Sequence, residues 1–313
     1  MTETPLAASQ LTLPLFVREA LAEPAPIRSM PGVVQHSLSS LSTAVAEAAS
    51  LGLGGVMIFG VPERRDALGS EATDPEGILS AAVRVALAEV GDALLVQADL
   101  CLDEFTDHGE CGLLAPDGSI DLPGTLDRYR EMALVLAESG AHMLGLSGMM
   151  RGQTAAVRGA LDASGHAGTR ILAYSAKYAS AMYGPFRDAV ESTYAGGPRS
   201  YQLDPRDRLS GIERAATDIA EGADIVMVKP AGGYLDVVAA IAAEQATAER
   251  PVPVWAYQVS GEYAAIEAAA SLGAIDRRRA ILESLDGIHR AGAQGILTYW
   301  AAEVAPWLAG EEA

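Results

Sequence analysis

Lysine is nearly absent from this chain of 313 residues: only Lys177 and Lys229 occur, although there are twenty arginines. Basic residues as a whole are outnumbered, with 22 against 41 acidic ones, and the formal net charge is −19. A surface that binds nucleic acid or an anionic membrane needs clustered Lys and Arg. The composition therefore argues against both kinds of partner.

Long apolar runs are also missing, since none approaches the roughly 18 residues of a membrane span. The first residues lack the basic region of a signal peptide, so we expect a cytoplasmic protein. Cysteine occurs only at Cys101 and Cys111. Two cysteines make a disulfide framework implausible and favour a reactive or metal-binding pair.

Short β-rich runs alternate with Ala-, Leu- and Glu-rich helical stretches along the whole chain. Eight such units predict a single-domain (β/α)8 TIM barrel over residues 11–313, preceded by a short extension over residues 1–10. An open doubly wound sheet is the alternative. The predicted strands are residues 11–17, 55–60, 93–101, 141–147, 169–177, 223–229, 252–260 and 295–299. Helices are predicted at 77–90, 126–140, 206–221 and 276–291, and long loops at 104–122 and 194–205.

A barrel of this kind carries its chemistry at the carboxyl ends of its strands. Six successive predicted strands end on polar or ionisable residues after apolar interiors. These residues are Asp99, Cys101, Ser147, Ser175, Lys177, Lys229, Tyr257, Ser260, Thr298 and Tyr299. This regularity supports the barrel and predicts an active site at that end.

The two lysines end two matching apolar runs, at 169–177 and 223–229. Burial disfavours the charged form of lysine, and the neutral amine is a nucleophile that forms Schiff bases with carbonyl compounds. A lysine that caps a strand and extends to solvent is the alternative. The repetition at two strand ends favours the catalytic interpretation.

The loop that begins at Cys101 gathers possible metal ligands. Cys101, Asp103 and Cys111 can converge on one cation if the loop folds back. Two thiolates, one carboxylate and an open position suit Zn²⁺ in a catalytic role. The alternative is two cysteines that pack as small apolar residues.

Three long motifs resemble the signatures of the porphobilinogen synthase family, also called 5-aminolevulinate dehydratase. They are SAKYASAMYGPFRD at 175–188, MVKPAGGYLD at 227–236 and AYQVSGEY at 256–263. SMPG at 29–32 and LTY at 297–299 agree with them. The resemblance implies a TIM-barrel lyase (a hydro-lyase) that condenses two 5-aminolevulinate molecules to porphobilinogen, with loss of two waters, in tetrapyrrole and heme biosynthesis.

The resemblance also implies roles for residues around the first substrate, which supplies the propionate side of the product. Lys177 is expected to form a Schiff base with it. Asp99 and Ser147 are expected near its amino group. Ser260 and Tyr299 resemble the groups that bind its carboxylate.

Other residues resemble those around the second substrate, which supplies the acetate side. Lys229 is expected to form the second Schiff base, and Arg187 and Gln202 to bind the carboxylate. The residues that resemble pocket-lining groups are Tyr183, Phe186 and Tyr257.

The chain departs from the family pattern in the metal loop and beside the second substrate. Zinc-type members have three cysteines where this chain has Cys101, Asp103 and Cys111, so we expect a hybrid zinc site. A carboxylate-binding arginine is replaced by Pro198, and the neighbouring Arg199 is a candidate substitute. Residues 147–153, SGMMRGQ, lack two acids and an arginine of the family motif.

Two regulatory features of the family are also expected to differ. Arg214 stands where many members have a glutamate that binds a regulatory magnesium ion, so allosteric Mg²⁺ is not expected. The N-terminal arm that embraces a neighbouring subunit is expected to be truncated, which predicts a homo-oligomer smaller than an octamer.

These departures leave two hypotheses for the function. The first is a divergent porphobilinogen synthase. The alternative is a paralogue in secondary metabolism that binds 5-aminolevulinate or a related amino ketone on Lys177 but uses a different second substrate. A catalytically inactive barrel is disfavoured because both lysines are present, and a class I aldolase would leave Lys229 without a role.

Overall fold

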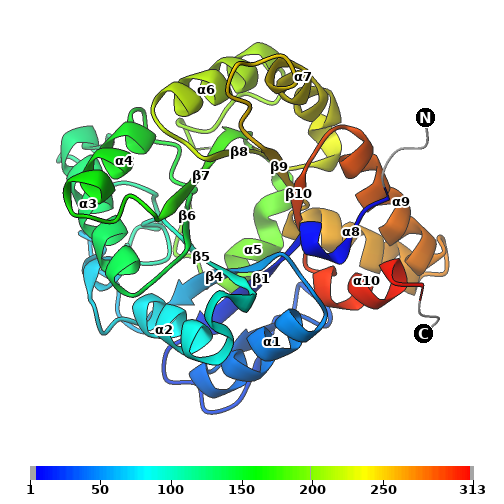
Figure 1. The fold of residues 1–313 in the computed structure, drawn as a ribbon. Coiled ribbons are helices and arrows are strands. Elements are labelled where there is room, and N and C mark those ends of the chain that lie inside the picture. The colour runs from blue at the N-terminus through cyan, green and yellow to red at the C-terminus, as the bar shows by residue number, and fades with distance from the viewer. Residues whose placement is uncertain (1–4, 198, 311–313) are drawn as a thin grey trace.

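Eight parallel strands close into a barrel in the computed structural model, which describes residues 5–197 and 199–310 (Figure 1). The strands are β1 (Leu11–Arg18), β4 (Gly55–Val61), β5 (Leu95–Asp99), β6 (Met143–Leu146), β7 (Arg170–Lys177), β8 (Ile225–Lys229), β9 (Val254–Tyr257) and β10 (Gly295–Leu297). Each pairs with the next in this order, and β10 returns to β1. The closure confirms the TIM barrel and excludes the open doubly wound sheet.

Helices surround the barrel and cover its outer face (Figure 1). They are α1 (Leu38–Ser50), α2 (Ile78–Val90), α3 (Leu122–Glu138), α4 (Gln153–Ala163), α6 (Arg208–Ala220), α7 (Leu235–Gln245), α9 (Arg277–Arg290) and α10 (Ala301–Leu308). Their apolar faces pack against strands that are buried along almost their whole length. Burial on both faces is the reason why the strands read as continuous apolar runs.

The predicted elements are present, and the differences lie at their ends. Helix α3 begins four residues before its predicted start. The Asp121 side chain caps it by accepting a hydrogen bond from Gly124 N at 3.2 Å, and Pro123 fits the first turn. The predicted strand at 252–260 ends at Tyr257, because Ser260 begins α8 (Ser260–Ser271).

Two short strands were not predicted from the sequence. They are β2 (Ala25–Pro26) and β3 (Val34–His36), and both are too short to carry a periodic pattern. β3 pairs in parallel with the end of β1, where Phe16 and Val17 are opposite Gln35 and His36. β10 pairs only with the start of β1, at Leu11 and Thr12. Toward the carboxyl end of β1, β3 therefore takes the place of β10 as the neighbouring strand.

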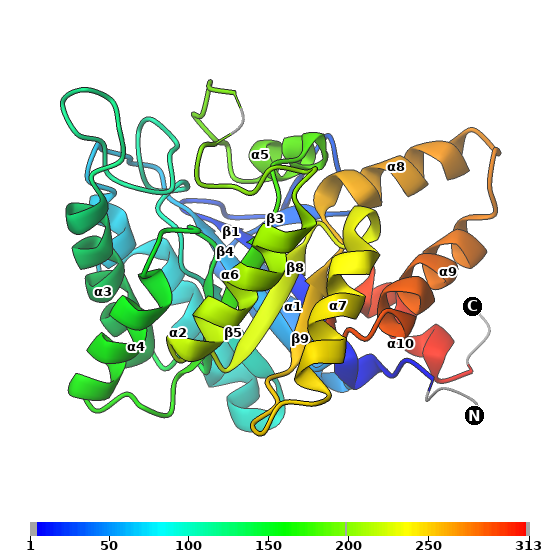
Figure 2. The ribbon, with the colours of Figure 1, turned by 90° about the horizontal axis from the view of Figure 1, so that it is seen from above.

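The segment after β7 lies across the carboxyl end of the barrel. It contains the 3-10 helix η4 (Ala181–Tyr183) and the short helix α5 (Gly184–Ala189). Figure 2 shows α5 above the strands, while α8 extends away from the barrel at the same level. We call residues 181–192 the lid, because they cover the strand ends that carry both lysines.

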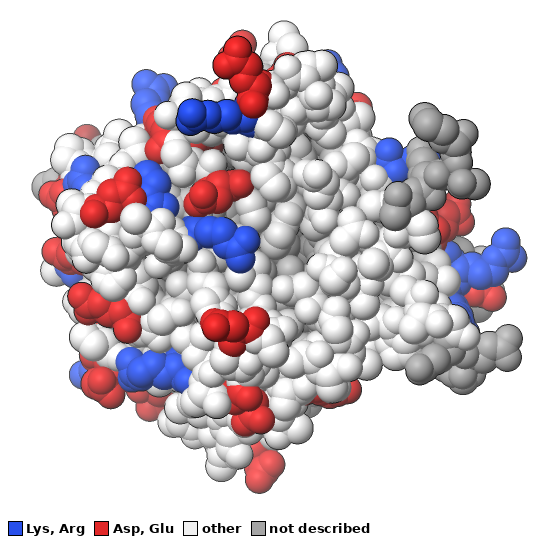
Figure 3. All heavy atoms as spheres, in the orientation of Figure 1, with Lys and Arg blue, Asp and Glu red and all other residues white. Residues whose placement is uncertain are grey.

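The opposite end of the barrel faces the viewer in Figures 1 and 3. Acidic and basic side chains are interspersed on this face, with broad areas that carry neither (Figure 3). Within residues 5–197 and 199–310, none of the helices combines the length and the apolar character that crossing a membrane requires.

Candidate active site

Lys177 and Lys229 meet at the mouth of the barrel. They end the neighbouring strands β7 and β8 and are paired directly in the register of these strands. Both side chains are buried, with only 6% and 5% of each residue exposed. The structure therefore brings together the two residues that the sequence singles out, and it excludes the alternative in which they extend into solvent.

Lys229 lies among four aromatic rings. Its Nζ is 4.2 Å from the ring centre of Tyr257, 5.0 Å from Tyr174, 5.2 Å from Phe186 and 5.6 Å from Tyr183. Burial among these rings, together with the positive charge of Lys177, lowers the pKa of Lys229 to about 7. A substantial fraction of Lys229 is therefore the neutral amine at neutral pH.

Lys177 lies beside a pair of polar residues from the two preceding strands. Its Nζ donates a hydrogen bond to the backbone oxygen of Ser147 at 2.6 Å. The Ser147 hydroxyl donates to Asp99 Oδ2 at 2.9 Å. Burial raises the pKa of Asp99 to about 7, although the nearby Lys229 charge opposes the rise. The Asp99 carboxyl group can therefore hold or release a proton near neutral pH, where Lys229 is partly neutral.

Tyr174 belongs to the site but was not predicted. Lys177 and Lys229 both lie near its ring, with Nζ at 5.9 Å and 5.0 Å from the ring centre. Strict alternation would turn residues 174 and 177 to opposite faces of the strand. A register shift between Ala173 and Ala176 breaks the alternation, so both side chains reach the site.

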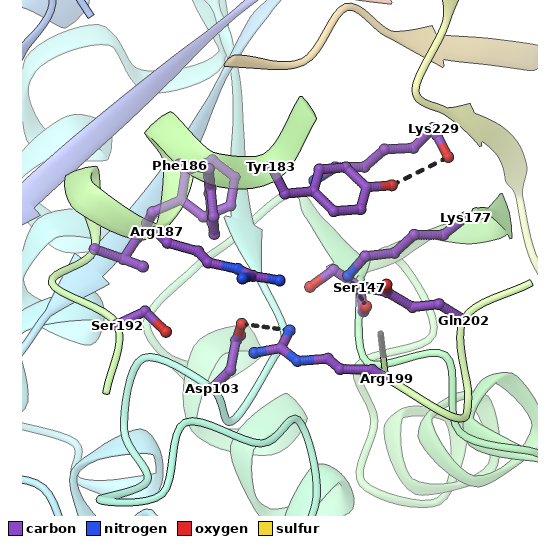
Figure 4. A pocket seen from close by; sticks show the side chains of 12 residues that line it. Asp103, Ser147, Lys177, Tyr183, Phe186, Arg187, Ser192, Arg199, Gln202 and Lys229 are labelled. Atoms are coloured by element: carbon purple, nitrogen blue, oxygen red, sulfur yellow. Dashed lines mark hydrogen bonds and ion pairs between the residues drawn. The ribbon is translucent and has the colours of Figure 1, made fainter. Parts of the chain in front are cut away.

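A cavity opens between the lysines and the lid (Figure 4). The predicted site residues that line it are Asp103, Ser147, Lys177, Tyr183, Phe186, Arg187, Arg199, Gln202 and Lys229. Phe59, Val190 and Ser192 also line it and were not predicted. Figure 4 shows the Arg187 guanidinium pointing into the cavity toward Lys177. The cavity thus brings two amines and a guanidinium together in one space.

The other predicted substrate residues lie next to this cavity. Ser260 Oγ accepts a hydrogen bond from Phe186 N in the lid at 2.9 Å. The hydroxyls of Tyr257 and Tyr299 are 3.1 Å apart. The ring of Phe16, which was not predicted, stacks 6.1 Å from that of Tyr299 and lies 5.8 Å from that of Phe186. Tyr257 therefore links the two parts of the site, because its ring lies beside Lys229 and its hydroxyl contacts that of Tyr299.

The metal loop folds back as expected. One ligand atom each from Cys101, Asp103 and Cys111 lies within 4.8 Å of the others, and all three residues are buried. A second group joins Asp99, Cys101 and Glu104 within the same distance. Glu104 was not predicted; burial, then the neighbouring Asp103, raises its pKa well above the usual range.

Arg199 contacts this metal loop rather than projecting only toward a substrate. Its Nη1 donates to Asp103 Oδ2 at 2.9 Å and to Cys111 Sγ at 3.2 Å. Burial alone would raise the pKa of Asp103, but the Arg199 charge, the hydrogen bond with Glu104 and the Lys177 charge together outweigh it and hold the pKa well below its usual range. A positive group thus already lies among the ligand atoms, so the donor set fits a cation such as Zn²⁺.

Two further departures from the family pattern are Pro198 and Arg214. Pro198 lies outside the described residues. Arg214 donates from Nε to both carboxylate oxygens of the buried Asp218 at 3.2 Å and from Nη2 to the backbone oxygen of Met150 at 2.8 Å. It therefore fastens the loop after β6 to helix α6.

Comparisons with known proteins give the same picture as the geometry. The model of a family described as delta-aminolevulinic acid dehydratase matches residues 1–307. The chain belongs to this family. A delta-aminolevulinic acid dehydratase of Streptomyces coelicolor is 56% identical over 97% of this chain and 92% of its own. One from Mycobacterium tuberculosis is 54% identical over 98% and 93%.

A solved structure agrees over the same length. The delta-aminolevulinic acid dehydratase (porphobilinogen synthase) of Toxoplasma gondii, in complex with the reaction product porphobilinogen, has a TM-score of 0.92. It is 39% identical and covers 97% of this chain and 86% of its own. The chain is thus an enzyme of the delta-aminolevulinic acid dehydratase family, a hydro-lyase of tetrapyrrole biosynthesis.

The expectation of a divergent member is wrong. Identity of 54–56% over nearly the whole chain places it well within the delta-aminolevulinic acid dehydratases. The differences from the family motifs lie at single positions, such as those within residues 147–153 and at Arg214. Such differences do not measure divergence of a whole chain. The family assignment also removes the support for the paralogue with a different second substrate.

Proposed function

We propose that Lys177 and Lys229 each form a Schiff base with one 5-aminolevulinate molecule, and that the two bound molecules condense to porphobilinogen. The observation that carries this proposal is the direct register pairing of the two lysines in one cavity. A single Schiff base would need only one of them. Two amines on adjacent rigid strands hold both substrates in place and so remove much of the entropy cost of joining them.

Each lysine acts as a neutral amine toward a ketone. Its nitrogen bonds to the carbonyl carbon, and the carbonyl oxygen leaves as water after it gains protons. Lys229 is suited to this step because its pKa is about 7. Asp99, whose pKa is also raised to about 7, is placed beside Lys177 through Ser147 to deliver or accept a proton.

The substrate carboxylates are bound at two different places. Arg187 and Gln202 line the cavity and bind the carboxylate of the second substrate, since a guanidinium and an amide both donate hydrogen bonds to it. Ser260 and Tyr299 bind the carboxylate of the first. Ser260 then exchanges its present contact with the lid for one with the substrate.

Cys101, Asp103 and Cys111 would hold Zn²⁺ in the metal loop. Bound zinc would act as a Lewis acid on an oxygen of the second substrate. A bound metal would replace the contacts of Arg199 with Asp103 and Cys111. Arg199 would then be free to support Arg187 at the second carboxylate, a role for which the sequence makes it a candidate.

Product analysis tests the proposal. Purified protein is given 5-aminolevulinate alone, and porphobilinogen is measured by mass spectrometry, with Zn²⁺ and with a chelator. We expect porphobilinogen from the natural chain and none from Lys229→Ala. Borohydride should trap an adduct on Lys177 in both proteins. A natural chain that traps this adduct but forms no porphobilinogen would instead support a different second substrate.

A further inference from the structure

The carboxyl end of the lid is held by side chains that come from elsewhere in the barrel. Arg65 Nη2 donates to the backbone oxygen of Val190 at 2.8 Å, and its Nη1 donates to that of Glu191. Gln35 Nε2 donates to the backbone oxygen of Ala189 at 2.9 Å. The last carbonyls of a helix have no partner within it, so these side chains bond to the last carbonyl of α5 and to the two that follow it.

Glu191 strengthens this contact at the point where the chain turns. Its φ is 51°, in the left-handed region that few residues other than glycine adopt. Its carboxylate pairs with Arg18 at 2.9 Å and accepts from Gln35 at 3.2 Å. We call Gln35, Arg65 and Glu191 the lid clasp.

The lid clasp determines where Arg187 lies. Ser192 N donates to the backbone oxygen of Arg187 at 2.9 Å, so the chain folds back on α5 immediately after the turn at Glu191. Phe186 and Arg187 are the residues of α5 that reach the cavity. A shift of the turn would therefore move the guanidinium that faces the lysines.

The residue after Arg65 is held in place by hydrogen bonds that do not involve the lid. The next residue, Asp66, bonds through its backbone to the metal loop, with Asp66 N donating to Phe105 O at 3.4 Å and Asp107 N donating to Asp66 O at 3.1 Å. The Asp66 side chain accepts from Leu68 N at 2.9 Å and from Ser70 N at 3.0 Å. The loop that carries Arg65 is thus fixed independently of the lid.

The other end of the lid is packed too closely to be the moving end. A Cβ on Gly261 would lie 2.5 Å from Met182 Cα and 2.5 Å from Met182 O, so α8 and the lid backbone touch there. The lysines are almost completely buried, so the lid must move to admit substrate. The lid clasp, built from hydrogen bonds and a half-exposed ion pair, is the end that can release and re-form.

We infer that Arg65 is a positioning residue for the second substrate: it closes the carboxyl end of the lid and thereby directs Arg187 at the cavity. This inference rests on the proposed role of Arg187 in binding the second carboxylate. Arg65 itself does not line the cavity in the described structure.

The adjacent Arg64 offers a matched control. Its side chain is 83% exposed and pairs with Glu71 on the surface, away from the lid. Arg64→Gln and Arg65→Gln therefore remove the same charge from neighbouring positions, and only the second removes the bonds to Val190 and Glu191. Arg65→Lys keeps the charge but cannot make both bonds with the same fork geometry.

Two measurements test the inference, namely steady-state kinetics with 5-aminolevulinate and the rate of tryptic cleavage after Arg187. For Arg65→Gln we expect kcat/KM to fall about 10- to 100-fold, mainly through KM, as for lost hydrogen bonds from a charged group. Cleavage after Arg187 should become faster at an unchanged melting temperature. For Arg65→Lys, kcat/KM and the cleavage rate should lie between those of the natural chain and Arg65→Gln. For Arg64→Gln, both should match the natural chain.

Arg65→Gln that matches Arg64→Gln in kinetics and cleavage would overturn the inference. So would a loss of activity explained by a lower melting temperature without faster cleavage after Arg187, since Arg65 would then be merely structural. The cleavage comparison needs no turnover. If the natural chain made no porphobilinogen, the proposed function would fail while this comparison still reported on the lid.

Discussion

Lys177 and Lys229 are opposite each other on neighbouring parallel strands, at the last residue of each. Adjacent strands are about 4.8 Å apart, so two ammonium groups at this position would repel strongly. Repulsion and burial act in the same direction on Lys229 and favour its neutral form. Burial is the larger cause, and the strand register adds to it, so that Lys229 has the neutral form that a Schiff-base lysine needs.

The reactivity of Lys229 should depend on pH with a midpoint near its pKa of about 7. Only the neutral amine attacks a ketone, so the rate of adduct formation should rise about tenfold per pH unit below 7 and level off above it. Borohydride trapping followed by peptide mass spectrometry measures this rate for Lys229 separately from Lys177. A rate that keeps rising up to pH 10 would show that the lysine has its ordinary pKa.

Replacing Lys229 by Met should stabilise the fold while abolishing activity. The folded-state pKa is about 7 and the ordinary value is 10.5, so the unfolded chain binds the proton more tightly. This cost is fully present below pH 7 and disappears as the pH rises toward 10.5. We expect a gain of roughly 2 to 4 kcal/mol in the free energy of unfolding at pH 7.

Denaturant unfolding at pH 7 and at pH 10 measures this effect. The difference between the two proteins should shrink at the higher pH. If the difference in the free energy of unfolding between the two proteins were the same at both pH values, the Lys229 charge would be solvated in the folded protein.

Gly261 should tolerate no side chain, because the lid backbone lies against it. Gly261→Ala places a Cβ 2.5 Å from Met182 backbone atoms and must displace the lid. We expect kcat/KM to fall about tenfold or more. Gly159→Ala is the control, since Gly159 lies in α4 with no heavy atom within 4 Å of the added Cβ. An active Gly261→Ala variant would show that the lid position matters little.

Arg199→Gln should make the fold depend on metal. Without the guanidinium, the buried Asp103 loses the cation with which it is paired in the metal-free protein, which costs about 3 to 5 kcal/mol. Zinc should restore this stability, so the melting temperature should rise more on adding Zn²⁺ than it does for the natural chain. The double variant Asp103→Asn with Arg199→Gln is the control and should lose most of the zinc response. If Zn²⁺ raised the melting temperature of Arg199→Gln no more than that of the natural chain, Asp103 would not be shared between Arg199 and the metal.

The strands could be predicted from the sequence because they are buried on both faces, and six of the eight predicted strands end on polar residues. Lys177 and Lys229 stood out because the chain has no other lysine. The contribution of Tyr174 could not be predicted, since it depends on a register shift within β7. The contacts of Arg199 with the metal loop and of Arg65 with the lid join residues about 90 and 125 positions apart in sequence, and no local pattern records them.

Strand β3 has a consequence for how this barrel can vary. It completes the wall beside the upper part of β1, and the same three residues supply Gln35, which reaches the lid. The wall of the barrel beside β1 and the position of the lid thus both depend on one short segment. An insertion or shift in β3 would remove its pairing with β1 and, at the same time, the hydrogen bond from Gln35 to the lid. We therefore expect this segment to accept substitutions only where Gln35 and its pairing with Phe16 are kept.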